Sequence, residues 1–149
     1  MPMLSNAPIL WSFRRCPFAM RARLAIAVSG QIVELREIVL QDKPAAFLAT
    51  SAKGTVPVLD LLDGTVIEES RDIMMWALGI NDPDGWLDIW HKQPDKAKTF
   101  LDNVDGPFKY DLDRYKYASR YEVCAARQHR ENGAQFLTEL DQSLSLIHI

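Results

Sequence analysis

The sequence has few cysteines and few histidines, and this limits the chemistry that it can support. Its two cysteines, Cys16 and Cys124, are too few for a disulfide framework and show no metal-ligand spacing. The three histidines, His91, His129 and His148, are scattered along the 149 residues without ligand spacing either. We therefore expect no metal site, and we expect a reducing compartment, the cytoplasm, as the location of the protein.

The chain also lacks the segments that would direct it to a membrane or to a nucleic acid. No apolar run approaches the roughly 20 residues of a membrane-spanning helix, and the first residues do not resemble a secretory signal. A formal net charge of −3 argues against a broad nucleic-acid footprint. No glycine-rich phosphate loop and no Gly-x-Ser-x-Gly or His-Glu-x-x-His pattern is present. We expect neither a membrane nor a nucleic acid among its partners.

The composition that remains is that of an ordinary globular protein, 48% hydrophobic and 25% charged. The turn-forming stretch 81–85, Asn-Asp-Pro-Asp-Gly, separates two regions with different sequence patterns. Residues 1–80 alternate short apolar runs with helical ones, whereas residues 86–149 contain no strand-like run. We expect an α/β domain over 1–80 and an all-α domain over 86–149. The second domain is expected to be incomplete, because it ends in apolar residues without a polar cap.

The first region predicts the element order β-α-β-α-β-β-α. Strands are expected over 8–13, 32–40, 56–62 and 65–68, and helices over 17–29, 44–51 and 70–78. A helix joins the first two strands, which should therefore be parallel, whereas Asp63–Gly64 predicts a two-residue turn between the last two, which should be antiparallel. Gly30 and Gly79 are expected to end two of the helices, and Ser70 to cap the last. A mixed four-stranded sheet with helices on its faces follows.

The second region is expected to be helical over 86–91, 95–104 and about 114–140. Gly133 is a candidate interruption of the last and longest of these helices.

The stretch 14–21, Arg-Arg-Cys-Pro-Phe-Ala-Met-Arg, is the most informative for chemistry. If Pro17 is the first helical residue, Cys16 is the N-cap, and its sulfur faces the unpaired amides at the positive end of the helix dipole. Those amides and the two preceding arginines favour the thiolate, the reactive form of cysteine. Position 19 is alanine, so the Cys-x-x-Cys pair is absent and a resolving thiol must come from outside. The alternative is that Cys16 is a small hydrophobic residue that happens to precede a proline.

Three motifs in this order resemble the glutathione transferases that carry a cysteine at the active site, the omega-type and related bacterial enzymes. They are Cys-Pro-Phe-Ala-Met-Arg-Ala-Arg (16–23), Lys-Gly-Thr-Val-Pro-Val-Leu (53–59) and Glu-Glu-Ser (68–70). The resemblance covers residues 8–80 and extends weakly into the helical part, over 106–109 and 112–117. It implies a thioredoxin-like N-terminal domain that binds glutathione, an all-helical C-terminal domain, and a hydrophobic acceptor site between them.

The resemblance implies that Cys16 is the catalytic residue, which holds the glutathione sulfur close by or forms a mixed disulfide with it. Val56–Pro57 matches the family's cis-proline loop, in which the backbone of Val56 pairs with the cysteinyl backbone of glutathione like an added strand. On the sequence alone, Pro57 could equally be a trans proline of an edge strand.

The resemblance gives three further residues a role in binding glutathione. Ser70 and its helix N-terminus would receive the γ-glutamyl carboxylate, and Glu69 would pair with the γ-glutamyl ammonium. Lys43 matches a lysine that contacts the glycyl end of glutathione. The residues alone leave open interpretations without a ligand. Ser70 would then be an N-cap, Glu69 a solvated acid and Lys43 a solvated loop lysine.

A cysteine thiolate attacks sulfur well, whereas a tyrosine or serine hydroxyl only donates a hydrogen bond to the glutathione thiolate. Cysteine sites therefore favour thiol–disulfide exchange, deglutathionylation and the reduction of dehydroascorbate-like or quinone-like compounds over conjugation. We expect a glutathione-dependent transferase or thiol–disulfide oxidoreductase in detoxification, with glutathione as co-substrate, a small electrophile or disulfide as second substrate, and a homodimer as the family's common assembly. Two alternatives remain open: a non-catalytic transferase-like protein-interaction module and a glutathione-independent monothiol redox protein.

Overall fold

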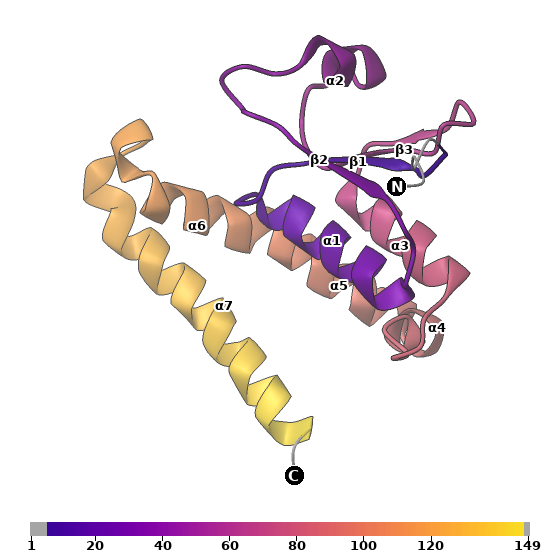
Figure 1. Ribbon diagram of the computed structural model, residues 1–149. Coiled ribbons are helices and arrows are strands. Elements are labelled where there is room, and N and C mark those ends of the chain that lie inside the picture. Colours follow the sequence, from indigo (N-terminus) through magenta and orange to yellow (C-terminus); the bar gives the residue numbers. More distant parts are fainter. Residues whose placement is uncertain (1–5, 148–149) are drawn as a thin grey trace. The chain divides into compact units, whose positions relative to one another are not determined.

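A four-stranded mixed sheet organises the first part of the chain in the computed structural model, which describes residues 6–147 (Figure 1). The strands are β1 (Ile9–Ser12), β2 (Glu34–Glu37), β3 (Val58–Asp60) and β4 (Val66–Ile67), in the order β2-β1-β3-β4. β1 and β2 are parallel, and the pairs β1–β3 and β3–β4 are antiparallel. The predicted element order and strand directions are confirmed, and the sheet is that of a thioredoxin-like fold.

Three helices accompany this sheet: α1 (Pro17–Ser29), α2 (Ala45–Thr50) and α3 (Ser70–Ile80). α1 has the predicted bounds, because Pro17 suits the first turn and Gly30 adopts the left-handed conformation, φ 70°, that ends a helix. α2 is one residue shorter than predicted at each end.

α3 begins at residue 70, as in the predicted range, but the predicted capping role of Ser70 and the predicted end at Gly79 are wrong. Glu69 is the N-cap and Ser70 is the first helical residue, and the helix continues through Gly79 to Ile80. Glycine inside a helix costs only about 1 kcal/mol relative to alanine, so one glycine need not end it. Asn81 follows the helix, and its side chain donates a hydrogen bond of 3.0 Å to the carbonyl of Ser29, which fixes the end of α3 against the end of α1.

The connection between β3 and β4 is longer than the predicted two-residue turn at Asp63–Gly64. The backbone N–H of Leu61 donates to the carbonyl of Thr65 at 3.0 Å, and this bond encloses a three-residue loop. Leu62 has a positive φ of 63°, and the carboxylate of Asp63 accepts a hydrogen bond of 2.8 Å from the backbone of Thr65. A local side-chain bond therefore stabilises a wider loop, and the strands that flank it are shorter than predicted.

The sheet has a core on each of its faces, because neighbouring residues of a strand point to opposite sides. Trp11 of β1 stands beside Val58 of β3, and both pack with Phe47 of α2. Leu10 and Leu59, the next pair in the ladder, are also buried and face the other side. Figure 1 shows α2 on one side of the sheet and α1 with α3 on the other.

The chain divides into two compact units, one up to Leu87 and one from Asp88 onward. The second unit is helical throughout the residues that the structure describes. It comprises α4 (Asp88–Lys92), α5 (Pro94–Asn103), a π-helical turn (Val104–Phe108), α6 (Lys109–Lys116), two 3₁₀ turns (Ala118–Arg120 and Val123–Ala125) and α7 (Ala126–Ile147).

The single helix predicted over about 114–140 is therefore wrong. α6 ends at Lys116 and α7 begins at Ala126, whereas Gly133 lies inside α7 without interrupting it. Side chains of the two helices contact each other, as His129 of α7 does Asp111 of α6. The expectation for the apolar end of the chain falls partly on residues 148–149, which lie outside the described residues.

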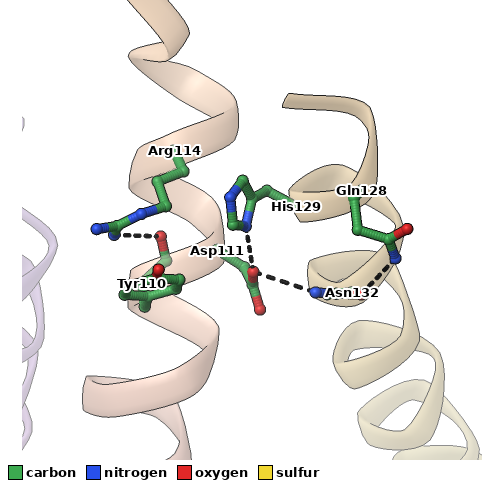
Figure 2. A network of polar contacts seen from close by, with 6 residues as sticks. All are labelled: Tyr110, Asp111, Arg114, Gln128, His129 and Asn132. Atoms are coloured by element: carbon green, nitrogen blue, oxygen red, sulfur yellow. Dashed lines mark hydrogen bonds and ion pairs between the residues drawn. The ribbon is translucent and has the colours of Figure 1, made fainter. Parts of the chain in front are cut away.

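A polar network joins α6 to α7 (Figure 2). Nδ1 of His129 lies 2.6 Å from Oδ1 of Asp111, and the side-chain amide of Asn132 donates to the same oxygen at 3.3 Å. The guanidinium of Arg114 lies over the ring of Tyr110, 3.4 Å from its centroid. Asp111, Arg114 and His129 are half-buried, and each has a partner within the second unit, so the network has a structural role that accounts for its residues.

Candidate functional site

Cys16 stands where β1 passes into α1. Its backbone is extended, with φ −78° and ψ 119°, and the helix begins at the next residue, so the prediction that Cys16 is the N-cap is confirmed. Its N–H donates to the carbonyl of Phe13 at 3.0 Å, and its carbonyl accepts from the N–H of Met20 at 2.9 Å. Both backbone groups of this half-buried residue are therefore held in place.

The sulfur does not make the contact that the helix position predicts. No side chain caps the first turn of α1, so Sγ forms no hydrogen bond with the helix amides. It lies 3.6 Å from the carbonyl oxygen of Val56 instead, at the distance of a thiol donating to a carbonyl. A thiol sulfur is a weak acceptor, so the amides attract it little, whereas the S–H group finds an acceptor in Val56.

Val56 belongs to the loop that leads into β3. The Val56–Pro57 peptide bond is cis, as the resemblance implies. Pro57 is buried, and the side chain of Val56 packs against the core cluster that contains Trp11 and Phe47. The carbonyl beside the sulfur is therefore held by residues anchored in the core.

Lys43 reaches the same loop from the segment before α2. Its Nζ atom lies 3.5 Å from the position that a Cβ atom would take on Gly54. Gly54 has φ 62°, a conformation that favours glycine, and its N–H donates to the carbonyl of Ser51 at 3.1 Å. The turn over 51–54 thus places its backbone beneath the ammonium of Lys43, one of the predicted site residues.

Ser70 is connected to α1 through Arg21, a role that no motif in the sequence indicates. Nε and Nη2 of Arg21 lie 3.0 and 2.8 Å from Oγ of Ser70 and donate hydrogen bonds to it. These bonds use both lone pairs of the hydroxyl and leave its proton to donate elsewhere. They also explain why Ser70 does not cap α3. A charged residue within an otherwise apolar helical stretch needs a polar partner, and this is the signal by which Arg21 could be suspected.

Glu69 also has a partner that the sequence motifs do not indicate. Its carboxylate forms an ion pair with the ammonium of Lys53, in the turn before the cis-proline. The hydrogen bond to Glu69 raises the pKa of Lys53 above its ordinary value, because the pair stabilises the charged ammonium. One residue earlier, the carboxylate of Glu68 accepts a hydrogen bond from the hydroxyl of Ser51.

These contacts connect the six predicted residues around one end of the sheet. The sulfur of Cys16 meets the backbone of Val56, next to Pro57. Lys53 lies on the turn just before Val56, and the ammonium of Lys43 lies against the same turn. Lys53 leads to Glu69, whose neighbour Ser70 is bonded to α1. A thiol, two lysine ammoniums and the start of a helix therefore lie in one region of the first unit, and a helix N-terminus and ammonium groups attract anions.

Two other kinds of site are not found in the described part of the chain. Across residues 6–147, no three His, Cys, Asp or Glu side chains are grouped as a metal ion would require. Within the same residues, no helix combines the length and apolar character needed to cross a bilayer.

Comparisons with known proteins identify the family. The family described as "Glutathione S-transferase, N-terminal domain" matches residues 10–84, about half of the chain. Glutathione S-transferase omega-1 from Rattus norvegicus is 38% identical over 61 residues, which are 41% of this chain and 25% of that protein. The chain thus matches about a quarter of the length of this curated relative.

Solved structures share the fold. The glutathione transferase Omega 3C of Trametes versicolor superposes with a TM-score of 0.72 at 19% identity, over 88% of this chain and 59% of that chain. A glutathione transferase homologue from Sulfitobacter with bound glutathione has a TM-score of 0.64 at 15% identity, over 87% of this chain and 66% of that one. With the thioredoxin-like sheet and the helical unit that follows it, these matches show that the chain belongs to the glutathione S-transferase family.

Proposed function

We propose that this chain acts as a cysteine-dependent glutathione transferase, which carries out thiol–disulfide exchange at Cys16. The observation that carries the proposal is the position of this cysteine at the N-cap of α1, with its sulfur 3.6 Å from the carbonyl of Val56 in the cis-proline loop. The similarity to an omega-class transferase supports the cysteine type. The second substrate belongs to the same proposal and is a small glutathionylated disulfide or a related electrophile.

The reaction has two balanced exchange steps. The thiolate of Cys16 attacks the glutathionyl sulfur of a mixed disulfide, a new S–S bond forms, and the other half leaves as a thiolate that takes up a proton. A second glutathione, as its thiolate, then attacks the Cys16–glutathione disulfide. Oxidised glutathione leaves, and the cysteine returns to its starting form.

Each part of glutathione would meet a group at the site. The backbone of Val56 would pair with the cysteinyl residue, because an extended peptide can add to an exposed backbone edge. The hydroxyl proton of Ser70 and the N-terminus of α3 would bind the γ-glutamyl carboxylate, with the charge of Arg21 close by. Glu69 would take the γ-glutamyl ammonium and Lys43 the glycyl carboxylate.

The test uses S-methylglutathione, which has no free thiol, against an alkylating reagent. Saturating S-methylglutathione is expected to slow the alkylation of Cys16 at least severalfold, because the bound peptide would cover the sulfur. Cys124 is exposed in the second unit and is the internal control, which should react at an unchanged rate. Mass spectrometry of the two cysteine peptides measures both rates in one sample. Equal rates of alkylation of Cys16 with and without the peptide would contradict the proposal. The remaining interpretations would be a non-catalytic protein-interaction module and a glutathione-independent redox protein.

Replacement of Arg21 by methionine is expected to weaken the binding of S-methylglutathione about tenfold, since hydrogen bonds to charged groups contribute about 1.5–3 kcal/mol. The hydroxyl of Ser70 would lose the two donors that orient it, and the start of α3 would lose a nearby positive charge. Titration calorimetry measures the affinity. Arg127→Met removes an exposed arginine from the second unit and should leave the affinity unchanged. Equal affinities of the two variants for S-methylglutathione would show that Arg21 does not contribute to binding.

A further inference from the structure

Lys53 forms an ion pair with the carboxylate of Glu69, the group that the proposed function assigns to binding of the substrate. Glu69 would bind the α-ammonium of the γ-glutamyl group, yet in this structure it is paired with the chain's own ammonium. Both groups are positively charged and donate hydrogen bonds. The carboxylate has a second oxygen, but two cations held at one carboxylate repel each other, so the pair with Lys53 is weakened when the peptide binds.

The backbone places Lys53 opposite Glu69. The turn over 51–54 is closed by the bond from Gly54 N–H to the carbonyl of Ser51. Ser51 is buried, and its hydroxyl is bonded to the carboxylate of Glu68, the residue before Glu69. Two adjacent contacts thus connect the turn to the end of β4. The side chains of Lys53 and Glu69 are 47% and 62% exposed, so this pair is open to exchange with a ligand from solvent.

We propose that Lys53 is a specificity-determining residue, a built-in counter-ion that competes with the α-ammonium of the peptide for Glu69 and so lowers the preference of the site for ligands that carry this group. The inference rests on the proposed function, because it needs glutathione to bind at Glu69. It concerns one contact, and it leaves the chemistry at Cys16 unchanged.

The direction of the effect follows from the charges. A ligand with an α-ammonium gains its pair with Glu69 but weakens the pair with Lys53 and is repelled by the Lys53 ammonium, so its net gain in binding free energy is small. A ligand without the ammonium leaves the internal pair intact. Exposed ion pairs contribute about 0.2–1 kcal/mol, so removal of the competitor should change affinity by a factor of about two to five at most.

The experiment compares two probes on the wild-type chain and on Lys53→Met. The probes are S-methylglutathione and its desamino analogue, in which a glutaryl group replaces the γ-glutamyl group, and calorimetry measures both affinities. In the variant, S-methylglutathione is expected to bind about two- to fivefold more tightly. The desamino analogue should bind with unchanged affinity. Lys98→Met, which breaks an exposed ion pair in the second unit, should change neither affinity.

A double-mutant cycle separates competition for Glu69 from a general effect of charge. In the Glu69→Gln background, the further change Lys53→Met is expected to leave the affinity for S-methylglutathione unchanged, because the contested carboxylate is gone. The same gain in both backgrounds would mean that Lys53 acts without Glu69, and this would overturn the inference.

Two more outcomes would overturn the inference while leaving the proposed function in place. Weaker binding of both probes to Lys53→Met would make Lys53 a direct ligand of a peptide carboxylate. Unchanged binding of S-methylglutathione would mean that the pair with Glu69 does not oppose the ligand. If S-methylglutathione binds to neither the wild-type chain nor the variant, the proposed function itself fails, and the inference fails with it.

Discussion

Replacing Cys16 with serine is expected to abolish glutathione-dependent thiol transfer, lowering its rate to the uncatalysed background, on the order of a hundredfold or more. A serine hydroxyl is not ionised at neutral pH and cannot form the mixed disulfide through which the exchange passes. The replacement is nearly the same size at a half-buried N-cap, where serine is also a favoured residue. The loss should therefore come from the chemistry and not from the fold. The hydroxyl can still donate a hydrogen bond to a glutathione thiolate, so the variant is expected to gain some conjugating activity.

The measurement is the rate of reduction of a glutathionylated disulfide by glutathione, followed through the oxidised glutathione that forms. Cys124→Ser provides the matched control, because it removes an exposed cysteine in the second unit by the same substitution. This control should keep the wild-type rate. Wild-type thiol transfer in Cys16→Ser would show that the sulfur is not the nucleophile.

Replacing Phe47 with alanine is expected to lower the free energy of unfolding by about 3–5 kcal/mol, because it empties a large space in a closed core. Phe47 is fully buried, and the centroid of its ring lies 5.5 Å from that of Trp11. α2 has only six residues, and Phe47 is its one buried side chain, so this contact holds the helix to the sheet. The same cluster supports Val56, and the affinity for S-methylglutathione should therefore fall as well.

Urea unfolding followed by tryptophan fluorescence measures the change, with the midpoint and the slope compared between variants. Leu48→Ala is the matched control, since Leu48 is the next residue of the same helix and is 43% exposed. This substitution should lower the free energy of unfolding by about 0.5 kcal/mol or less. Similar midpoints for the two variants would show that α2 is not anchored through Phe47.

Local signals were sufficient to predict most of the first unit. The proline before an alanine-rich run and the glycine after it predict the bounds of α1, because each acts through its own backbone geometry. The alternation of apolar runs and turns predicts the strands and the order of the elements along the chain. The prediction fails at the ends of α3, where Ser70 and Gly79 offer cap signals that the structure does not use, and across the break between α6 and α7.

The residues of the site also differ in how far the sequence predicts them. From the residue types and the family resemblance, six side chains could be named, and the cis bond before Pro57 could be expected. The partners of Arg21 and Lys53 could not be found in this way, because they lie 49 and 16 residues away along the chain. Such contacts depend on how helices and loops pack, and no local pattern encodes them.

The sequence by itself determined the order of the elements, the cysteine at the start of α1 and the family, because each depends on neighbouring residues. Only the tertiary structure decided where the sulfur of Cys16 is directed and which partners Glu69 and Ser70 have. The physical reason is that a polar side chain bonds to the best acceptor or donor within its reach. Folding alone brings distant segments into that reach.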